Sequence, residues 1–404
     1  MTEANPANDV VNLPVDKDWL VRIINEKCPG SNGILKGYTC SRIGEGKGFL
    51  SVVTRVVFDW DANSKGIEAL PKGVVIKKPT IDIITAMDAT AAEILTKDML
   101  ITFHNQECKT YEYLLAHPPP PLPLAKCFYA EKMTEESGSG ILILEDLTEL
   151  AVSLSFTFHV QNYKTSDDNT EGQIMHLAER IAALQAYGFN HPSYTEYFEL
   201  EATSPFDEFE KHLPANLKDL RADVGDECLR HPDDFFLNLF AGSRKKIHMF
   251  KNPKNFGFTP VISLGDVQPN NILWLRNEAN KPSDSIAAFI DFQLAHIGNC
   301  VNDITATMVF GLPAEKRRSI QQKVIDRYLQ VLKEKTVADG CPISRAEAIK
   351  VNEILKVQYA CIGVSMMPMF RKIMSAGGSS KESQDEQLER FIQTLEEVDE
   401  AEYC

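Results

Sequence analysis

The sequence has little of what membrane-spanning, nucleic-acid-binding and secreted proteins need. No apolar stretch in the 404 residues approaches the roughly 20 residues that cross a bilayer. The formal net charge is −15, whereas a protein that binds nucleic acid concentrates Lys and Arg. The first residues, MTEANPANDVV, have no basic start followed by an apolar run, so we expect no secretory signal. We therefore expect no nucleic-acid partner and no membrane span.

Cysteine pairs and metal-ligand spacings are also missing from the sequence. The nine cysteines are an odd number, none stands in a Cys-x-x-Cys pair, and the chain has no Asn-x-Ser/Thr site. These facts favour a reducing, cytoplasmic setting. The nine histidines show no paired ligand spacing, so we expect no zinc site, and buried reduced thiols explain the cysteines.

The apolar patterns indicate two parts that differ in secondary structure, in a chain too long for one compact core. Strand patterns cluster in the first part at 49–58, 73–77, 126–130 and 141–144, with helical patterns at 16–28 and about 88–116. Helical patterns dominate the second part, at about 171–188, 233–250, 313–337 and 343–374, around a β patch at 261–291. The Glu-rich last twenty residues look like a solvated helix or tail.

This order of elements predicts an α+β fold with two lobes. We expect an N-terminal helix and extension at 1–34, a small strand-rich N-lobe at 35–147, and a larger helical C-lobe at 148–404. The oligomeric state is left open by the sequence.

The strongest chemical signal is a set of three polar residues in the β patch. Asp266 is followed five positions later by Asn271, and an apolar stretch, 286–290, leads into Asp291. Phosphoryl transfer from ATP uses one carboxylate for the proton of the attacking hydroxyl, and an amide oxygen and a second carboxylate for magnesium. The alternative is a polar turn in which the aspartate caps the backbone. Because each residue lies at the edge of an apolar strand, where an unpaired carboxylate is costly, we prefer a site for ATP and Mg²⁺.

Three features of the first part fit the same chemistry, although each is weak alone. Gly44, Gly46 and Gly48 could let backbone N–H groups face phosphate oxygens, but the loop is neither a Walker A loop nor followed by the helix of a dinucleotide-binding fold. Lys77 ends an apolar strand about thirty residues later, and Glu107 falls on the next predicted helix. That carboxylate could pair with Lys77 and direct it to the nucleotide phosphates. Separately, Lys77 would be a solvated strand end and Glu107 a surface glutamate.

The stretch from Gly140 to Leu147 reads as a buried strand that runs to the lobe boundary. Adenine could stack there and bond the backbone from Glu145 to Leu147, although a plain core strand explains the pattern equally well. An apolar acceptor pocket has a weak candidate in four aromatic residues, Tyr187, Phe189, Tyr194 and Phe198. Aromatic residues at such spacing are more often core.

The order of these motifs over residues 35–375 resembles the ecdysteroid-kinase-like (CHK) family, within the choline-kinase and aminoglycoside-phosphotransferase branch of the protein-kinase-like fold. The resemblance is carried by the glycine loop of 44–51, by 104–107 with Tyr111, by 145–147 and by 290–293, as in nematode-type members. It implies a two-lobed kinase-like fold. Asp266 is then the catalytic base, Asn271 and Asp291 are magnesium ligands, and Lys77 with Glu107 positions the phosphates.

The chain departs from that family's pattern at three places. Leu264 replaces the His of His-Gly-Asp, an imidazole that braces the catalytic loop against the metal-binding strand in this fold. The residues after Asp266, 267–269, replace the more usual Leu-Trp, and Gln185 stands where many relatives have His. Leu264 therefore keeps open an alternative function, a pseudokinase-like protein that binds nucleotide or a ligand with weak or no turnover.

The spacing after the metal-binding strand favours a small acceptor. Asp291 precedes Asp303 by only twelve residues, and no Ala-Pro-Glu follows. The resemblance implies that Asp303 is the structural aspartate of this branch. This spacing leaves no room for a phosphorylatable activation loop. We therefore predict a small-molecule kinase that uses ATP and Mg²⁺ to phosphorylate a hydroxyl on a steroid-like, sugar-like or xenobiotic substrate.

Overall fold

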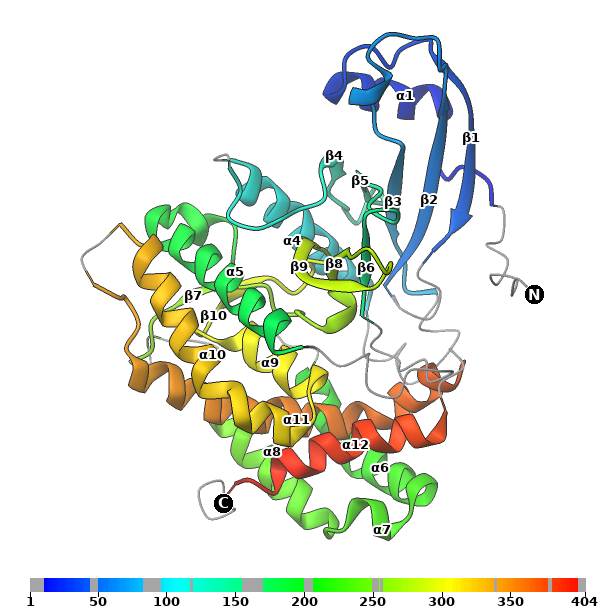
Figure 1. Cartoon of the computed structure of the whole chain (residues 1–404). Helices are drawn as coiled ribbons and strands as arrows, with labels where there is room; N and C mark the ends of the chain where they lie inside the picture. Colours follow the sequence, from blue (N-terminus) through cyan, green and yellow to red (C-terminus); the bar gives the residue numbers. More distant parts are fainter. Residues whose placement is uncertain are drawn as a thin grey trace. The chain divides into compact units, whose positions relative to one another are not determined.

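The chain divides into two compact units. The structure, a computed structural model, describes residues 11–43, 50–82, 96–116, 119–154, 170–199, 206–248, 254, 257–337, 340–376 and 380–398. Unit 1 comprises residues 1–111 and 124–150, and unit 2 comprises residues 112–123 and 151–404. Unit 1 is built around a sheet and unit 2 mainly from helices (Figure 1), so the predicted α+β class with a β-rich first part and a helical second part is confirmed.

Unit 1 contains a five-stranded antiparallel sheet in the order β1-β2-β3-β5-β4. Its strands are β1 (Leu35–Arg42), β2 (Ser51–Trp60), β3 (Gly73–Pro79), β4 (Cys127–Glu131) and β5 (Ile141–Glu145). Four of them match the predicted strands within a few residues, and β1, rich in polar side chains, had no predicted range. β3 has a partner on each side, which places Lys77 inside the sheet, opposite Val53 of β2 and Leu142 of β5.

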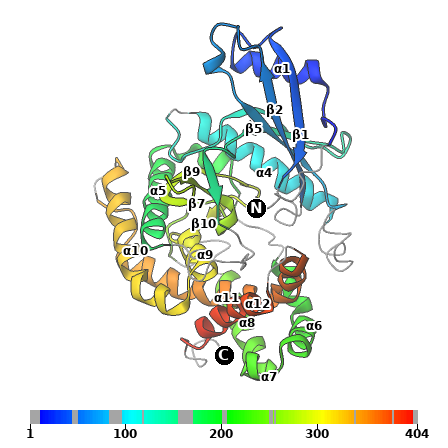
Figure 2. The same ribbon diagram turned by 45° about the vertical axis from the view of Figure 1, so that its right-hand side comes forward.

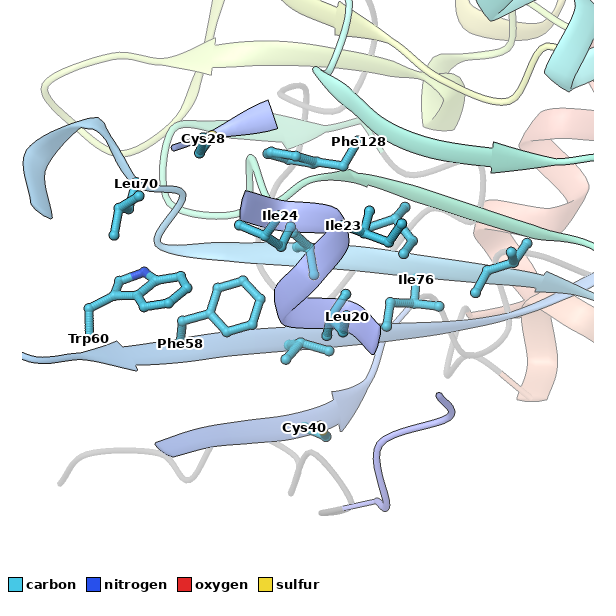
Figure 3. Packing of buried hydrophobic residues seen from close by; sticks show 14 residues of the cluster. Leu20, Ile23, Ile24, Cys28, Cys40, Phe58, Trp60, Leu70, Ile76 and Phe128 are labelled. Atoms are coloured by element: carbon cyan, nitrogen blue, oxygen red, sulfur yellow. The ribbon is translucent and has the colours of Figure 1, made fainter. Parts of the chain in front are cut away.

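One face of this sheet is covered by helix α1 (Lys17–Lys27). The side chain of Asp16 begins the helix by accepting the Trp19 N–H at 2.8 Å. Its apolar stripe, Leu20, Ile23 and Ile24, is buried against side chains of the strands (Figure 3). The strand residues in this core alternate along the chain, as Val74 and Ile76 do in β3. Strand side chains alternate between faces, so Lys77 points away from α1.

Helix α4 (Lys97–Ala116) carries Glu107, and the η1 turn (Ile67–Ala69) joins β2 to β3. The predicted helix of 88–116 is thus observed from residue 97 onward, since 83–95 lie outside the described residues. Residues 97–111 of α4 belong to unit 1 and the remainder to unit 2.

Unit 2 combines two small antiparallel sheets with a larger set of helices (Figures 1 and 2). The strands are β6 (Ala151–Ser153), β8 (Ile272–Arg276) and β9 (Pro282–Phe289) in one sheet, and β7 (Val261–Ser263) and β10 (His296–Gly298) in the other. The helices are α5 (Glu171–Asn190), α6 (Phe206–Val224), α7 (Asp226–Leu229), α8 (Asp233–His248), α9 (Asn302–Gly311), α10 (Ala314–Lys335), α11 (Arg345–Ala376) and α12 (Lys381–Leu395), with the η2 turn (Pro192–Glu196) and the η4 turn (Pro269–Asn271).

The C-terminal helix α12 differs from the expected solvated helix or tail. Its residues Leu388, Phe391, Ile392 and Leu395 are all buried. Phe391 lies against Gly363 of α11, where a Cβ atom would come within 2.6 Å of the ring. The Glu-rich composition hid an apolar stripe at helical spacing, which a glycine on the neighbouring helix accommodates. Within the described chain, no helix has an apolar stretch long enough to cross a membrane.

Candidate active site

In unit 1 the predicted pair of Lys77 and Glu107 is brought together. Lys77 Nζ lies 2.7 Å from Glu107 Oε2, and the two side chains are 13% and 2% exposed. β3 directs Lys77 away from the α1 core, and helix α4 presents Glu107 to it. A buried carboxylate needs a cation or several donors, so this pair has a physical reason to stay formed. The lysine is thereby held at one place on the face of the sheet.

Two neighbours of Glu107 fix the helix that carries it. Asn105 exchanges hydrogen bonds with the backbone of Met133, donating to its carbonyl at 2.9 Å and accepting its N–H at 2.8 Å. His104 Nε2 lies 2.7 Å from the carbonyl oxygen of Glu131. Burial lowers the pKa of His104 below its usual 6.5, and the nearby charge of Lys77 lowers it further, against the Glu131 carbonyl. Sequence reasoning selected Glu107 and missed the docking role of His104 and Asn105 on the same helix.

The room for His104 comes from Gly140 in the stretch before β5. A Cβ atom at residue 140 would come within 2.3 Å of His104 Nε2. The segment for which adenine binding was predicted begins at this glycine and ends beyond β5. Its first residue admits the histidine that docks α4.

The segment from Glu145 to Leu147 is tied to the sheet through Asp146. Asp146 Oδ2 accepts from Arg55 Nε at 2.6 Å, and its other oxygen accepts from the backbone N–H of Thr148 at 3.0 Å. The N–H of Glu145 donates to the carbonyl of Lys126. The N–H of Leu147 has no hydrogen-bond partner within the part of the chain that the structure describes. The sequence placed Asp146 in the predicted hinge segment, but its pairing with Arg55 was not predicted.

Gly44, Gly46 and Gly48, the glycine loop of the prediction, lie outside the described residues.

In unit 2 the loop after β7 is anchored by Asp303, which is fully buried at the start of α9. Its carboxylate accepts from Ser263 Oγ at 2.8 Å, the Leu264 N–H at 2.9 Å and the Gly265 N–H at 3.0 Å. Three donors compensate for the burial of its charge. The sequence pointed to Asp303 as structural, and the hydrogen bonds show which backbone it holds.

A second layer supports that anchor. Asn302 Nδ2 donates to Ser263 Oγ at 2.8 Å, and Tyr359 Oη of α11 donates to Asn302 Oδ1 at 2.9 Å. Ser263, Asn302 and Tyr359 were not singled out in the sequence. The missed signal is a serine at the end of an all-buried strand, since such a hydroxyl needs a partner.

Asp266 and Asn271, predicted to act together, are in direct contact. Asn271 Nδ2 donates to Asp266 Oδ2 and to the Asp266 carbonyl, both at 3.0 Å. Gln268 Nε2 donates to Asp266 Oδ1 at 2.7 Å. A carboxylate only accepts hydrogen bonds, so both amides must turn their NH₂ groups towards Asp266. The oxygen Asn271 Oδ1 then faces away from Asp266 and accepts from Asn270 at 3.2 Å, which leaves it a second lone pair.

Asp291 is brought to the same loop by the pairing of two strands. β8 pairs with β9 at Ile272 and Phe289, and the pairing continues with the Ile290 N–H donating to the Asn271 carbonyl at 3.1 Å. Asn271 and Asp291 therefore stand next to the same end of this strand pair. Asp291 has a φ of +65°, a left-handed conformation that costs a non-glycine residue roughly 1–2 kcal/mol.

The strain is not confined to Asp291. Val301, directly before the anchor residues of α9, has a φ of +54° although it is β-branched and buried. Such outliers persist only where surrounding contacts enforce them, and they cluster at functional sites. Strain beside both Asp291 and Asp303 marks this part of unit 2 as a candidate site.

Leu264, at the place of the expected histidine, is 3% exposed. The loop is instead held through its backbone, by Asp303 and by close packing at Gly265. Gly265 has a φ of +80°, and a Cβ atom there would come within 2.1 Å of the Leu294 carbonyl oxygen. The segment that follows Asp291 thus packs directly on the loop that carries Asp266. These contacts hold the loop through its backbone at the place where the family resemblance implies a bracing histidine.

Gln185, at the other position where many relatives have His, supports the same loop from α5. Its Nε2 donates to the Ile262 carbonyl of β7 at 3.3 Å, and its oxygen accepts from the Tyr328 hydroxyl of α10. Complete burial raises the pKa of Tyr328 well above its usual value, which keeps it a neutral donor.

The aromatic residues suggested for an acceptor pocket form a packed cluster instead. Phe198 and Tyr187 lie with ring centroids 5.3 and 5.4 Å from that of Tyr113, and Phe198 is buried. Tyr194 is half-buried, and burial raises its pKa. We therefore interpret these aromatic residues as part of the core and not as the lining of an acceptor pocket.

The donor set of unit 2 fits Mg²⁺. Asn271 Oδ1 and the Asp291 carboxylate are hard oxygen ligands, the kind that Mg²⁺ takes together with phosphate oxygens and water. Among the described residues there is no group of three or more His, Cys, Asp or Glu side chains that could hold a metal alone. A phosphate-bound Mg²⁺ needs only one or two protein ligands, so the two side chains suffice.

Comparison with known proteins places the chain in a family. A family model, DUF1679, described as "Uncharacterized oxidoreductase dhs-27", matches residues 23–400. The chain belongs to this family. Over 333 residues it is 22% identical to the Caenorhabditis elegans "Uncharacterized oxidoreductase dhs-27", covering 80% of this chain and 38% of that protein. Over 271 residues it is 25% identical to the Caenorhabditis elegans "Uncharacterized kinase-like protein D1044.1", covering 64% of this chain and 65% of that protein. The chain thus spans less than two thirds of either curated relative.

Solved structures similar to this DUF1679 chain include two phosphotransferases. Wild-type aminoglycoside 2'-phosphotransferase-IIIa in complex with GDP gives a TM-score of 0.46 at 13% identity, covering 95% of this chain and 99% of that one. Choline kinase LicA from Streptococcus pneumoniae gives 0.45 at 14% identity, covering 94% and 100%. At these values the likeness says nothing about what the chain binds.

Proposed function

We propose that this protein is a small-molecule kinase that transfers phosphate from ATP, with Mg²⁺, to a hydroxyl group. The observation that carries the proposal is the contact of Asn271 with Asp266, beside the strand end that leads into Asp291. Phosphoryl transfer uses a carboxylate that takes the proton of the hydroxyl, and an amide oxygen and a second carboxylate that bind the metal ion. The second carboxylate here, Asp291, has a strained backbone conformation. The name of the Caenorhabditis elegans relative D1044.1, a kinase-like protein, supports the proposal.

Each residue has a specific task in this proposal. Asp266 accepts the proton of the attacking hydroxyl at its carboxylate, which Asn271 keeps oriented. Asn271 Oδ1 and Asp291 hold Mg²⁺, which, when bound, neutralises charge on the phosphates. Glu107 holds Lys77, whose ammonium binds phosphate oxygens.

The remaining predicted residues would bind the nucleotide. The N–H of Leu147 and the backbone of Glu145 would bond the adenine, and Gly44, Gly46 and Gly48 would bring backbone N–H groups to the phosphates. We also propose that the protein is a CHK-type kinase and that it works in the cytoplasm.

The length of chain after Asp291 supports a small acceptor. Residues 291–303 are all described, and they form a turn, the short strand β10 and the start of α9. Phe292 and Ala295 are buried within this stretch. Residues 291–303 form no long activation loop of the kind that positions a peptide, so a steroid-like, sugar-like or xenobiotic alcohol is the substrate class we propose.

The test is incubation of the protein with ATP, Mg²⁺ and a metabolite extract, with mass-spectrometric detection of phosphorylated products. We expect products from the wild type and none from Asp266→Asn. Asp326→Asn, which changes a half-exposed aspartate of α10, is the matched control and should behave as wild type. The absence of any Asp266-dependent product across broad extracts would contradict the proposal.

The buried apolar Leu264 favours one alternative, a pseudokinase-like protein that binds nucleotide without turnover. Thermal unfolding with ATP and Mg²⁺ tests nucleotide binding, and the product assay then separates the two functions. Both functions require stabilisation by the nucleotide that is lost in Asp291→Ala. Stabilisation without any product identifies the pseudokinase, and product formation excludes it.

A further inference from the structure

Gln268 contacts the proposed catalytic base directly. Its Nε2 is 2.7 Å from Asp266 Oδ1, while Asn271 Nδ2 engages Oδ2 at 3.0 Å. Each oxygen of the carboxylate therefore receives one amide N–H, which fixes its rotation about the side-chain bond.

The backbone beneath Gln268 is rigid. Pro269 restricts the preceding residue to an extended conformation, and Gln268 has φ −89° and ψ 160°. Its carbonyl accepts the Asn271 N–H at 2.9 Å, closing the η4 turn. On its other side Val267 is buried, and its carbonyl accepts from Thr307 of α9. The side chain of Gln268 thus starts from a fixed point.

The second polar atom of the Gln268 amide, Oε1, points in a different direction from Nε2. Because the NH₂ group faces a carboxylate, Oε1 must face away from Asp266. The side chain is half-buried, and Oε1 has no hydrogen-bond partner among the residues that the structure describes. An acceptor atom next to the base, held in place and without a partner, can bind a donor of a ligand.

We propose that Gln268 orients Asp266 through Nε2 and recognises a second hydrogen-bond donor of the substrate through Oε1. The inference rests on the proposed kinase function. The reacting hydroxyl must come within about 2.6–3.2 Å of Asp266 to give up its proton. A hydroxyl or amine on the adjacent carbon then lies within reach of Oε1. The substrate class is therefore a 1,2-diol or a 1,2-amino alcohol.

The transfer step is balanced without any further reactant. The hydroxyl oxygen bonds to the γ-phosphorus of ATP as the bond from that phosphorus to the β-phosphate oxygen breaks. ADP leaves, and the hydroxyl proton goes to Asp266. Gln268 takes no part in bond making, so it is a positioning and specificity-determining residue.

The test compares trans-1,2-cyclohexanediol and trans-2-aminocyclohexanol with cyclohexanol as acceptors for ATP and Mg²⁺. We expect the wild type to prefer the two bifunctional probes by roughly tenfold in kcat/KM, the value of one satisfied hydrogen bond. In Gln268→Met the preference should disappear and kcat should fall for all three probes. Gln268→Lys, which keeps a donor for Asp266 and loses the outward acceptor, should retain the rate on cyclohexanol and lose the preference.

The outcomes separate this inference from the function on which it rests. If the wild type phosphorylates alcohols but shows no preference, or if the preference survives in both variants, the role of Gln268 is refuted and the kinase function stands. If the wild type transfers phosphate to no acceptor, including those of the metabolite extract, both fail. Gln330→Met removes an exposed amide that donates to Glu334 at 2.9 Å, and it should leave the preference and rate unchanged.

Discussion

The backbone N–H of Leu264 donates to Asp303 Oδ2 at 2.9 Å. The position that would carry an imidazole in a His-Gly-Asp loop is thus held through its main chain, by an aspartate that also accepts from Ser263 and Gly265. A main-chain hydrogen bond does not depend on the side chain at residue 264. The loop can therefore keep its geometry with an apolar residue at that position.

Replacing Leu264 by His should weaken folding without improving catalysis. The side chain is 3% exposed, and a polar ring without a partner there costs about 1–3 kcal/mol. Chemical denaturation would show the lower free energy of unfolding, while phosphate transfer should not rise. Leu264→Met, which keeps an apolar side chain of similar volume, is the control and should cost less. A large gain in transfer with His would contradict the backbone-held loop.

Replacing Gly265 by Ala should displace the loop. The new Cβ atom would lie 2.1 Å from the Leu294 carbonyl oxygen, which is backbone and cannot turn aside. A shift near 1 Å at Asp266 lowers the rate on the order of 100-fold. Steady-state kinetics would measure this loss in kcat.

Gly66→Ala is the matched control for that change. Gly66 has a φ of +81°, close to the +80° of Gly265, but nothing lies within 4 Å of its added Cβ atom. It should carry only the backbone strain of roughly 1–2 kcal/mol and leave kcat unchanged. Equal loss of kcat in both variants would show that strain, and not the clash, decides the outcome.

Replacing Lys77 by Met should reduce transfer on the order of 100-fold, because a preorganised cation near phosphate groups contributes several kcal/mol. The stabilisation of the protein by ATP and Mg²⁺ in thermal unfolding should shrink as well. Lys72→Met is the control, since Lys72 pairs with Glu149 in an exposed ion pair. If both variants bind and turn over alike, Lys77 has no role with the nucleotide.

The stability of unit 1 should depend on pH through His104. Burial lowers its pKa below the usual 6.5, so the unfolded chain binds a proton at a higher pH than the folded one. The free energy of unfolding should therefore fall as pH drops from about 6.5 towards the lower pKa of the folded state. Urea unfolding at several pH values, compared with His104→Gln, would measure it. Parallel pH profiles for the two proteins would rule out this contribution.

The elements with a strong periodic pattern could be predicted from sequence. β2, β3, β4, β5 and the long helices α5, α10 and α11 lie within a few residues of their predicted ranges. β1 had no predicted range, and the burial of α12 was not expected, because both have polar compositions. Neighbours in the tertiary structure provide the packing of both elements. The composition of a segment indicates only how buried it is on average. A single contact, such as that of Phe391 with Gly363, depends on which residue the neighbouring helix places there.

By itself, the sequence determined the candidate residues and their order, since spacing between Asp266, Asn271 and Asp291 is a property of the chain. The tertiary structure decided which contacts hold them: it brings together Lys77 and Glu107, which the sequence could only suggest as a pair, and it shows two contacts that were not predicted, Gln268 with Asp266 and Asp303 with the backbone of residue 264. Those partners are up to 39 residues apart, and no periodicity records them. A hydrogen bond depends on distance and direction in space, which only the packed chain provides.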